Sequence, residues 1–191
     1  MDKPDLQRRK VLNLITAAVT GVGMVFALIP FMRSLLPNAL VKALGAPLEV
    51  DISDIKMGAI KVIEWRGKPV WIVRRSPDSI NQLATNAAKL ADPQSSNAAQ
   101  PPGIEGDTRA LRPEYLVLVG ICTHLGCSPL YKPQAGDSEI GADWEGGFFC
   151  PCHGSLFDMS GRVYKNMPAP TNLEVPPYKF TDSGSIIIGE S

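Results

Sequence analysis

The chain has 191 residues, of which 45% are hydrophobic, and its formal net charge is zero. A chain of this length can form one compact domain and a smaller additional segment. Because no basic stripe stands out, nucleic-acid binding has no electrostatic support. The four cysteines and the two histidines all fall in two short segments, 122–127 and 150–153. Cysteines that only fill a hydrophobic core would not cluster in this way.

The N-terminal region has the composition of a membrane anchor. Four basic side chains among the first ten residues precede 22 residues without charge, Val11 to Met32. As a helix, this run spans about 33 Å, the thickness of a bilayer core. We predict a cytoplasmic segment at 1–10 and a transmembrane helix at 11–36, with the C-terminal domain on the other side of the membrane. The alternative is a cleaved signal peptide, for which the apolar run is too long.

Residues 37–47 separate this helix from the rest of the chain. They include two prolines, a glycine and several small residues, and they show little periodicity. We predict a flexible tether, whose part from Ala39 to Pro47 reaches on the order of 30 Å when it is fully extended. Composition alone leaves a short structured turn equally open.

From residue 48 onward the pattern predicts an all-β domain with one helix. Alternating or apolar runs predict strands at 48–52, 59–64, 69–73, 115–121, 148–149, 173–175, 178–181 and 185–188. Residues 65–68 are expected to form a hairpin turn. Ser76 and Pro77 begin a helix that should extend to about Leu90. Residues 92–108 are rich in Pro, Ser, Asn and Gln, which predicts a surface loop.

Two short segments contain the cysteines and histidines, which are the residues best suited to bind a metal. They read Cys122-Thr-His124-Leu-Gly-Cys127 and Cys150-Pro-Cys152-His153-Gly-Ser155. Glycines and prolines in and beside them suit tight turns. Two such loops, brought tip to tip, form a site with four ligands, and thiolate and imidazole ligands suit either zinc or an iron–sulfur cluster.

These segments resemble the two ligand boxes of the Rieske family. The resemblance extends to Trp65-Arg66-Gly67-Lys68-Pro69, to Pro168-Ala169-Pro170 and to the N-terminal anchor, and so covers nearly the whole chain. The chain is most similar to the bacterial Rieske subunit of the cytochrome bc quinol oxidoreductases, or complex III. This resemblance implies small antiparallel sheets at 48–191 with cluster-binding loops at their tip, in a subdomain at about 115–175.

The resemblance also implies the ligands of one [2Fe–2S] cluster. Cys122 and Cys150 would bind one iron, and His124 and His153 would bind the other. Two ferric ions, two sulfides and two thiolates sum to zero charge. Reduction is therefore easier than with four thiolates, and the family potentials range from roughly −150 to +300 mV.

Other residues of the two boxes acquire roles by the same resemblance. Cys127 and Cys152 would form a disulfide between the loops, which fits an oxidising, exported location. Ser155 matches the family serine whose hydroxyl bonds a bridging sulfide, with an ordinary turn serine as the alternative. Leu125 would shield the cluster between the two imidazoles.

Two positions depart from the family pattern. Many members have at position 157 a tyrosine that bonds a ligand sulfur, and Phe157 cannot make this bond. Met167 stands where glycine is common, directly before the proline loop 168–170 that is expected to cover the cluster. Trp65 and Trp144 are interpreted as packing residues rather than as electron relays.

The function implied by the resemblance is electron transfer. The cluster would accept one electron from quinol at the cytochrome b subunit, with a proton taken by a histidine ligand, and would pass the electron to a c-type cytochrome subunit. His153 is the residue expected to meet the quinol, and His124 is the other exposed imidazole. The complex is expected to be dimeric and to contribute to proton translocation.

The expected location is the bacterial inner membrane, with a periplasmic head. Arg8 and Arg9 match a twin-arginine export signal, with plain positive-inside charge as the alternative. The export signal gains weight because a cofactor inserted in the cytoplasm requires export of a folded domain. The alternatives to this function are a Rieske ferredoxin, a Rieske subunit of another oxidoreductase such as an arsenite oxidase, and a structural zinc module.

Overall fold

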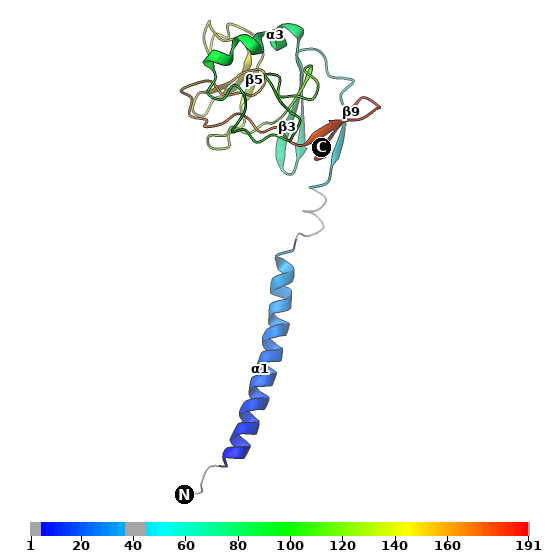
Figure 1. The fold of residues 1–191 in the computed structure, drawn as a ribbon, viewed down its shortest axis with the longest axis vertical. Coiled ribbons are helices and arrows are strands. Elements are labelled where there is room, and N and C mark those ends of the chain that lie inside the picture. The colour runs from blue at the N-terminus through cyan, green and yellow to red at the C-terminus, as the bar shows by residue number, and fades with distance from the viewer. Residues whose placement is uncertain (1–4, 37–44, 191) are drawn as a thin grey trace. The chain divides into compact units, whose positions relative to one another are not determined.

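The computed structural model describes residues 5–36 and 45–190. The chain divides into two units, residues 1–43 and 44–191. The first contains the helix α1 (Leu6–Ser34), and the second is a head built mainly of short strands (Figure 1). Most of the predicted tether, residues 37–44, lies outside the described residues.

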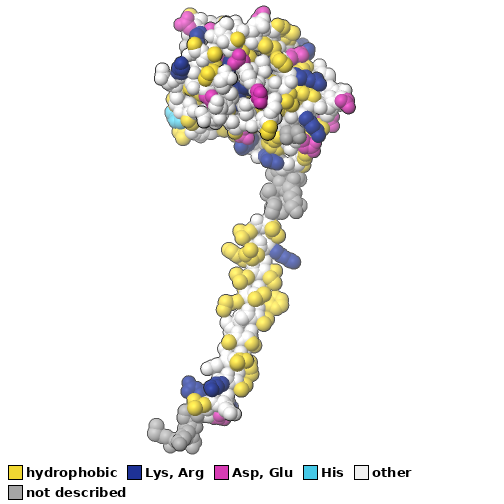
Figure 2. Space-filling view, viewed as in Figure 1, with side chains coloured by type: hydrophobic (Ala, Val, Ile, Leu, Met, Phe, Trp, Pro, Cys, Tyr) yellow, Lys and Arg dark blue, Asp and Glu magenta, His cyan; other side chains and the backbone are white. Residues whose placement is uncertain are grey.

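Helix α1 has the length and composition of a membrane span. Asp5 caps its N-terminus, because the carboxylate accepts hydrogen bonds from the backbone N–H groups of Gln7 and Arg8. The helix therefore begins before the uncharged run and takes in its basic flank. Its 29 residues extend over about 44 Å. Hydrophobic side chains cover the helix between basic residues near each end (Figure 2).

Within residues 45–190, the head contains three antiparallel sheets of three strands each. The first has the order β1 (Leu48–Asp51), β9 (Ser185–Ile188), β8 (Tyr178–Phe180). The second has the order β2 (Ile60–Trp65), β3 (Lys68–Arg74), β4 (Tyr115–Val119). The third has the order β5 (Leu130–Lys132), β6 (Gly147–Cys150), β7 (Ser155–Phe157). These sheets agree with the predicted β architecture, although β5 and β7, each three residues long, were not predicted.

The predicted helix after Ser76 is shorter than expected. Ser76 caps α3 (Pro77–Thr85), because its hydroxyl accepts a hydrogen bond from Ser79 N–H, and a 3₁₀ turn, η1 (Ala87–Lys89), follows. Helix geometry does not reach Leu90. Leu90 is buried and bridges to Tyr164, and the neighbouring Ala91 N–H donates to the carbonyl of Val163. Pairing with a distant segment thus replaces the last helical turn.

The strand predicted at 173–175 is wrong. This described segment is irregular, and its backbone hydrogen bonds go to three different partners. Leu173 N–H donates to the carbonyl of Gly161, Val119 N–H donates to the carbonyl of Glu174, and Val175 N–H donates to that of Ala99. Leu173 and Val175 are buried, which accounts for the apolar pattern. Two prolines, 176 and 177, follow directly and lack the N–H groups that a ladder requires.

Three fully buried arginines organise the turn Asp158–Arg162, which follows β7. Arg162 donates through Nε to Asp158 Oδ2 at 2.8 Å, through Nη1 to Asp107 at 2.6 Å and through Nη2 to the carbonyl of Leu83 at 2.7 Å. Arg75 and Arg109 donate to backbone carbonyls of the same turn. Burial lowers the pKa of both guanidiniums to about 10, so they remain charged at neutral pH.

Two of these arginines, Arg109 and Arg162, hold the segment 92–108, which was predicted to be a surface loop. It has almost no regular structure, as expected, but Ser95 and Ile104 are buried. Arg162 contacts its Pro93 and Asp107, and Arg109 Nε donates to Gln100 Oε1 at 3.0 Å. The loop is therefore packed into the head rather than only covering it.

We expect Arg162→Met to destabilise the head by about 3–5 kcal/mol, because the substitution leaves the buried Asp158 carboxylate without its partner. Urea unfolding of the detergent-solubilised chain measures this loss. Lys61→Met is the matched control, since its pair with Asp54 is exposed and contributes about 1 kcal/mol or less. Equal losses in the two variants would contradict the role of the buried pair.

Candidate metal centre

The first loop, 122–127, is closed by its own backbone. Cys122 N–H donates to the carbonyl of Cys127 at 2.7 Å, and Gly126 N–H donates to the carbonyl of Cys122 at 3.1 Å. Gly126 has φ +84°, a conformation that favours glycine. The turn places Leu125 at the surface, where 71% of the residue is exposed.

The second loop connects β6 to β7 in the third sheet. Cys150 and Ser155 are paired in register at its base, and Gly154 N–H donates to the carbonyl of Cys150 at 2.9 Å. Gly154, with φ +75°, again turns the chain. Cys150 is therefore buried at the end of a strand, whereas His153 is exposed in the turn.

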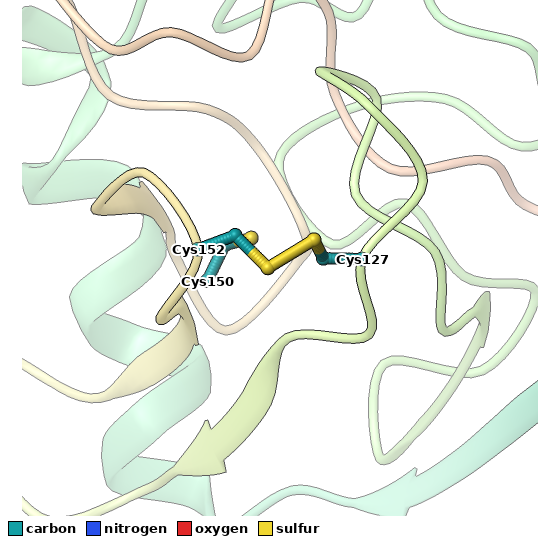
Figure 3. A group of neighbouring side chains, drawn as sticks. All are labelled: Cys127, Cys150 and Cys152. Carbon is teal, nitrogen blue, oxygen red and sulfur yellow. A yellow bond between two sulfur atoms is a disulfide. The ribbon is translucent and has the colours of Figure 1, made fainter.

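A disulfide between Cys127 and Cys152 joins the two loops. The Cys150 sulfur lies within 4.8 Å of both bridged sulfurs (Figure 3). A disulfide sulfur carries no thiolate charge, so within this group only Cys150 is available as a thiolate ligand. Closing the 25-residue separation contributes about 3–4 kcal/mol in the chain-entropy account.

The two remaining cysteines are buried in the interior. Cys122 and Cys150 are free thiols, each only 2% exposed. Burial raises the pKa of the Cys122 thiol, while the backbone N–H of His124 opposes this shift. A nearby cation or metal ion is what ordinarily stabilises two such thiolates.

The two histidine rings, one from each loop, lie against each other. Their ring centroids are 4.7 Å apart, with the ring planes nearly perpendicular at 86°. Among the described residues, His124 Nδ1 is a buried nitrogen without a hydrogen-bond partner. Leaving such an atom unsatisfied costs about 1–3 kcal/mol, and coordination to a metal would satisfy it. Two thiols and two imidazoles on adjoining loops thus fit the ligand set of a Rieske cluster.

Ser155 is positioned to support this site. Its hydroxyl oxygen accepts a hydrogen bond from Ala169 N–H at 3.1 Å, which leaves the hydroxyl proton free to donate toward Cys122. Ala169 is buried at the centre of the proline loop. Thr123, which sequence reasoning missed, ties the first loop to the same region by donating to the carbonyl of Thr171 at 2.7 Å.

The two departures from the family pattern have different surroundings. Phe157 is fully buried and lies opposite Phe148 across β6 and β7. Met167 is partly buried and packs against the hydrophobic core. Trp65 and Trp144 are both largely buried, in agreement with their interpretation as packing residues.

Comparison with known proteins decides which cofactor such a site holds. The Rieske [2Fe-2S] domain family matches residues 48–177. The chain belongs to the Rieske iron–sulfur family. The cofactor is therefore a [2Fe–2S] cluster, and the alternative of a zinc module is wrong.

Full-length Rieske relatives match both the head and the N-terminal region. The ubiquinol-cytochrome c reductase iron-sulfur subunit of Allochromatium vinosum is 51% identical over 183 residues, which cover 96% of this chain and 88% of that protein. The corresponding protein of Blastochloris viridis is 43% identical and covers 98% and 96%. A solved chain of a hyperthermophilic respiratory complex III is 28% identical, with a TM-score of 0.51 and coverage of 91% and 98%.

We expect His124→Ala and His153→Ala each to abolish the Rieske cluster, because one iron would lose one of its two protein ligands. Iron content and the electron paramagnetic resonance (EPR) spectrum of the reduced protein measure the loss. Leu125→Ala, in the same loop but without a ligand atom, should retain the cluster. A normal Rieske spectrum in either histidine variant would refute the proposed ligand set.

Phe157→Tyr should raise the midpoint potential, since a hydroxyl that donates to a ligand thiolate stabilises the more negative reduced state. If the two redox states differ by about 1 kcal/mol in this bond, the rise is about 40 mV. Protein-film voltammetry at fixed pH measures it. Phe180→Tyr, on β8, is the control and should leave the potential unchanged. An unchanged or lower potential in Phe157→Tyr would mean that the hydroxyl does not reach the cluster.

Proposed function

We propose that this chain is the electron-transfer subunit of a membrane-bound ubiquinol–cytochrome c reductase. The observation that carries the proposal is the 51% identity to such a subunit over 96% of the chain. This match includes the N-terminal helix, which a soluble Rieske ferredoxin does not need. The loaded cluster supplies a one-electron acceptor of high potential. In this proposal the electron comes from quinol bound at a cytochrome b subunit and leaves to a c-type cytochrome subunit.

The arrangement of the proposed ligands supports electron and proton transfer through the exposed histidines at the tip of the head. The thiols are buried, whereas His153 is exposed and His124 is partly exposed. His153 would contact the quinol and take its proton at the ring nitrogen that does not face the iron. His124 would be the second imidazole at the contact surface.

An exposed apolar side chain in the first ligand loop supports a docking role. Leu125, which follows His124 in the chain, has 71% of its surface exposed. A quinone ring and the rim of a haem are both apolar, so either contact would cover this side chain. Leu125 would exclude water there and shield the cluster.

The membrane topology is part of the proposal. Arg8, Arg9 and Lys10 lie at the start of α1, and Arg33 lies in its last turn. This charge difference supports a cytoplasmic N-terminus and a periplasmic head in a bacterial inner membrane. Arg8 and Arg9 would also serve as a twin-arginine signal, and residues 37–47 would be the tether on which the head moves within a dimeric complex.

Purification of the tagged chain from its native membranes tests the assignment. We expect b-type and c-type haem to co-purify with it, together with quinol-dependent reduction of cytochrome c. Co-purification with a different cofactor-bearing oxidoreductase, or the absence of both haems from an intact preparation, would overturn the proposal.

Leu125→Asp should slow quinol-dependent cytochrome c reduction by about tenfold or more, the effect of losing a central contact residue. The EPR spectrum of the cluster should remain normal, because Leu125 supplies no ligand. Leu111→Asp, at another exposed leucine, is the matched control and should retain turnover. Equal rates in the two variants would argue against docking through Leu125.

A further inference from the structure

Trp71, on β3, packs directly against the segment that leads into the first ligand loop. It lies opposite Leu118 in the β3–β4 register, and its indole extends over Gly120, two residues before Cys122. A Cβ added at Gly120 would lie 2.2 Å from Trp71 Cε2 and 2.4 Å from Nε1. The φ angle of Gly120 is not in the left-handed region, so glycine is required here by the indole and not by the backbone.

The same indole contacts the strand that leads into the second ligand loop. Trp71 and Phe148 are stacked, with ring centroids 5.1 Å apart and an interplanar angle of 13°. Phe148, on β6, precedes Cys150 by two residues. Tyr131 continues the aromatic group at 5.6 Å from Phe148, and its hydroxyl donates to the carbonyl of Gly58 at 3.0 Å.

From these contacts we propose that Trp71 is a positioning residue of the metal centre. It sets the separation of the two strands that deliver Cys122 and Cys150, and so the spacing of the two thiolates on one iron. The inference rests on the proposed ligand set, in which these two cysteines bind the same iron.

The disulfide joins the two loops at Cys127 and Cys152, whereas Cys122 and Cys150 are free thiols that no covalent bond links. Trp71 acts on the segments that lead to these two cysteines. Strand β4 of the second sheet leads toward Cys122, β6 of the third sheet ends at Cys150, and an aromatic stack connects the two sheets. Stacked rings favour a defined offset geometry, and a metal site tolerates misplacement of its ligands by only about 0.5 Å.

Trp65 offers a matched control on the same hairpin. It is 6% exposed and Trp71 is 4% exposed. Each covers a glycine: a Cβ at Gly189 would lie 3.0 Å from the Trp65 ring. Trp65 Nε1 donates to the carbonyl of Ala46 at 3.1 Å, at the start of the head. Truncating Trp65 therefore removes a similar buried surface without touching the segments that lead to Cys122 or Cys150.

The test compares Trp71→Leu, Trp71→Phe and Trp65→Leu in the full-length, cluster-loaded protein. The readouts are the EPR spectrum and midpoint potential of the cluster, the rate of iron release and the thermal unfolding temperature. We expect Trp71→Leu to release iron faster than the wild type by a factor of about three to ten, corresponding to the loss of one aromatic pair. Its EPR spectrum and its potential should both shift, because a displaced Cys122 would change the geometry of the iron that it is proposed to bind.

The conservative and control variants should behave differently. Trp71→Phe retains a ring for the stack and should restore the wild-type spectrum and potential. Trp65→Leu should lower the unfolding temperature but keep both spectroscopic properties. Gly120→Ala gives a second route to the same displacement, since it forces the intact indole off the strand without altering any ligand, and it should reproduce the Trp71→Leu spectrum.

Two results would overturn the inference: a wild-type spectrum and potential in Trp71→Leu, or the same spectral shift in Trp65→Leu. If Trp71→Leu binds no iron while Trp65→Leu binds it normally, the proposal is supported. Because a variant without iron has no cluster spectrum, Gly120→Ala then serves to measure the spectral change. If the wild type itself lacked a Rieske spectrum, the ligand assignment would fail instead, so the two failures are distinguishable.

Discussion

The structure depends on holding together two ligand loops that share no backbone hydrogen-bond ladder. The cysteines that bridge them are 25 residues apart in the chain. Each loop is first made rigid by its own turn hydrogen bonds, to Cys122 in one and to Cys150 in the other. The disulfide then joins Cys127 of the first loop to Cys152 of the second, and the proline loop, bonded through Ala169 to Ser155, closes one side. The site is thus made from irregular backbone, with its rigidity supplied by contacts between elements.

Burial separates the proposed ligands into two groups. The thiols of Cys122 and Cys150 lie in the interior, where hydrogen bonds and the low dielectric would control the potential of a bound cluster, whereas His153 lies at the surface. With the cluster bound, reduction would place an excess negative charge in the interior. The exposed imidazole of His153 would then be the group through which a proton could compensate this charge. A fully buried site with four thiolates would not start from a neutral charge, and it would have no exposed group that could take up a proton.

The elements with a strong local pattern could be predicted from the sequence. The hairpin of β2 and β3, the cap at Ser76 and the two cysteine–histidine segments all carry their signal within a few residues. The predictions fail where contacts between residues distant in the sequence determine the local structure. Leu173 and Val175 are apolar because they are buried, yet the backbone hydrogen bonds of 173–175 are divided among Gly161, Val119 and Ala99 instead of following one strand. Trp71 carried no signal of its role, because Gly120 and Phe148 become its neighbours only in the fold.

The buried arginines show how such irregular segments can still support an ordered site. Three guanidiniums lie at a turn that has one fully buried carboxylate, Asp158. Because one carboxylate cannot accept from all their N–H groups, most of these donors bond to backbone carbonyls. Side-chain donors thereby replace the ladder that the 92–108 segment lacks. Since the turn follows β7 directly, this network anchors the exit of the second ligand loop, while Trp71 contacts its entry strand. The loop that carries Cys150 and His153 is therefore held on both sides, which allows its tip to be exposed without being loosely held.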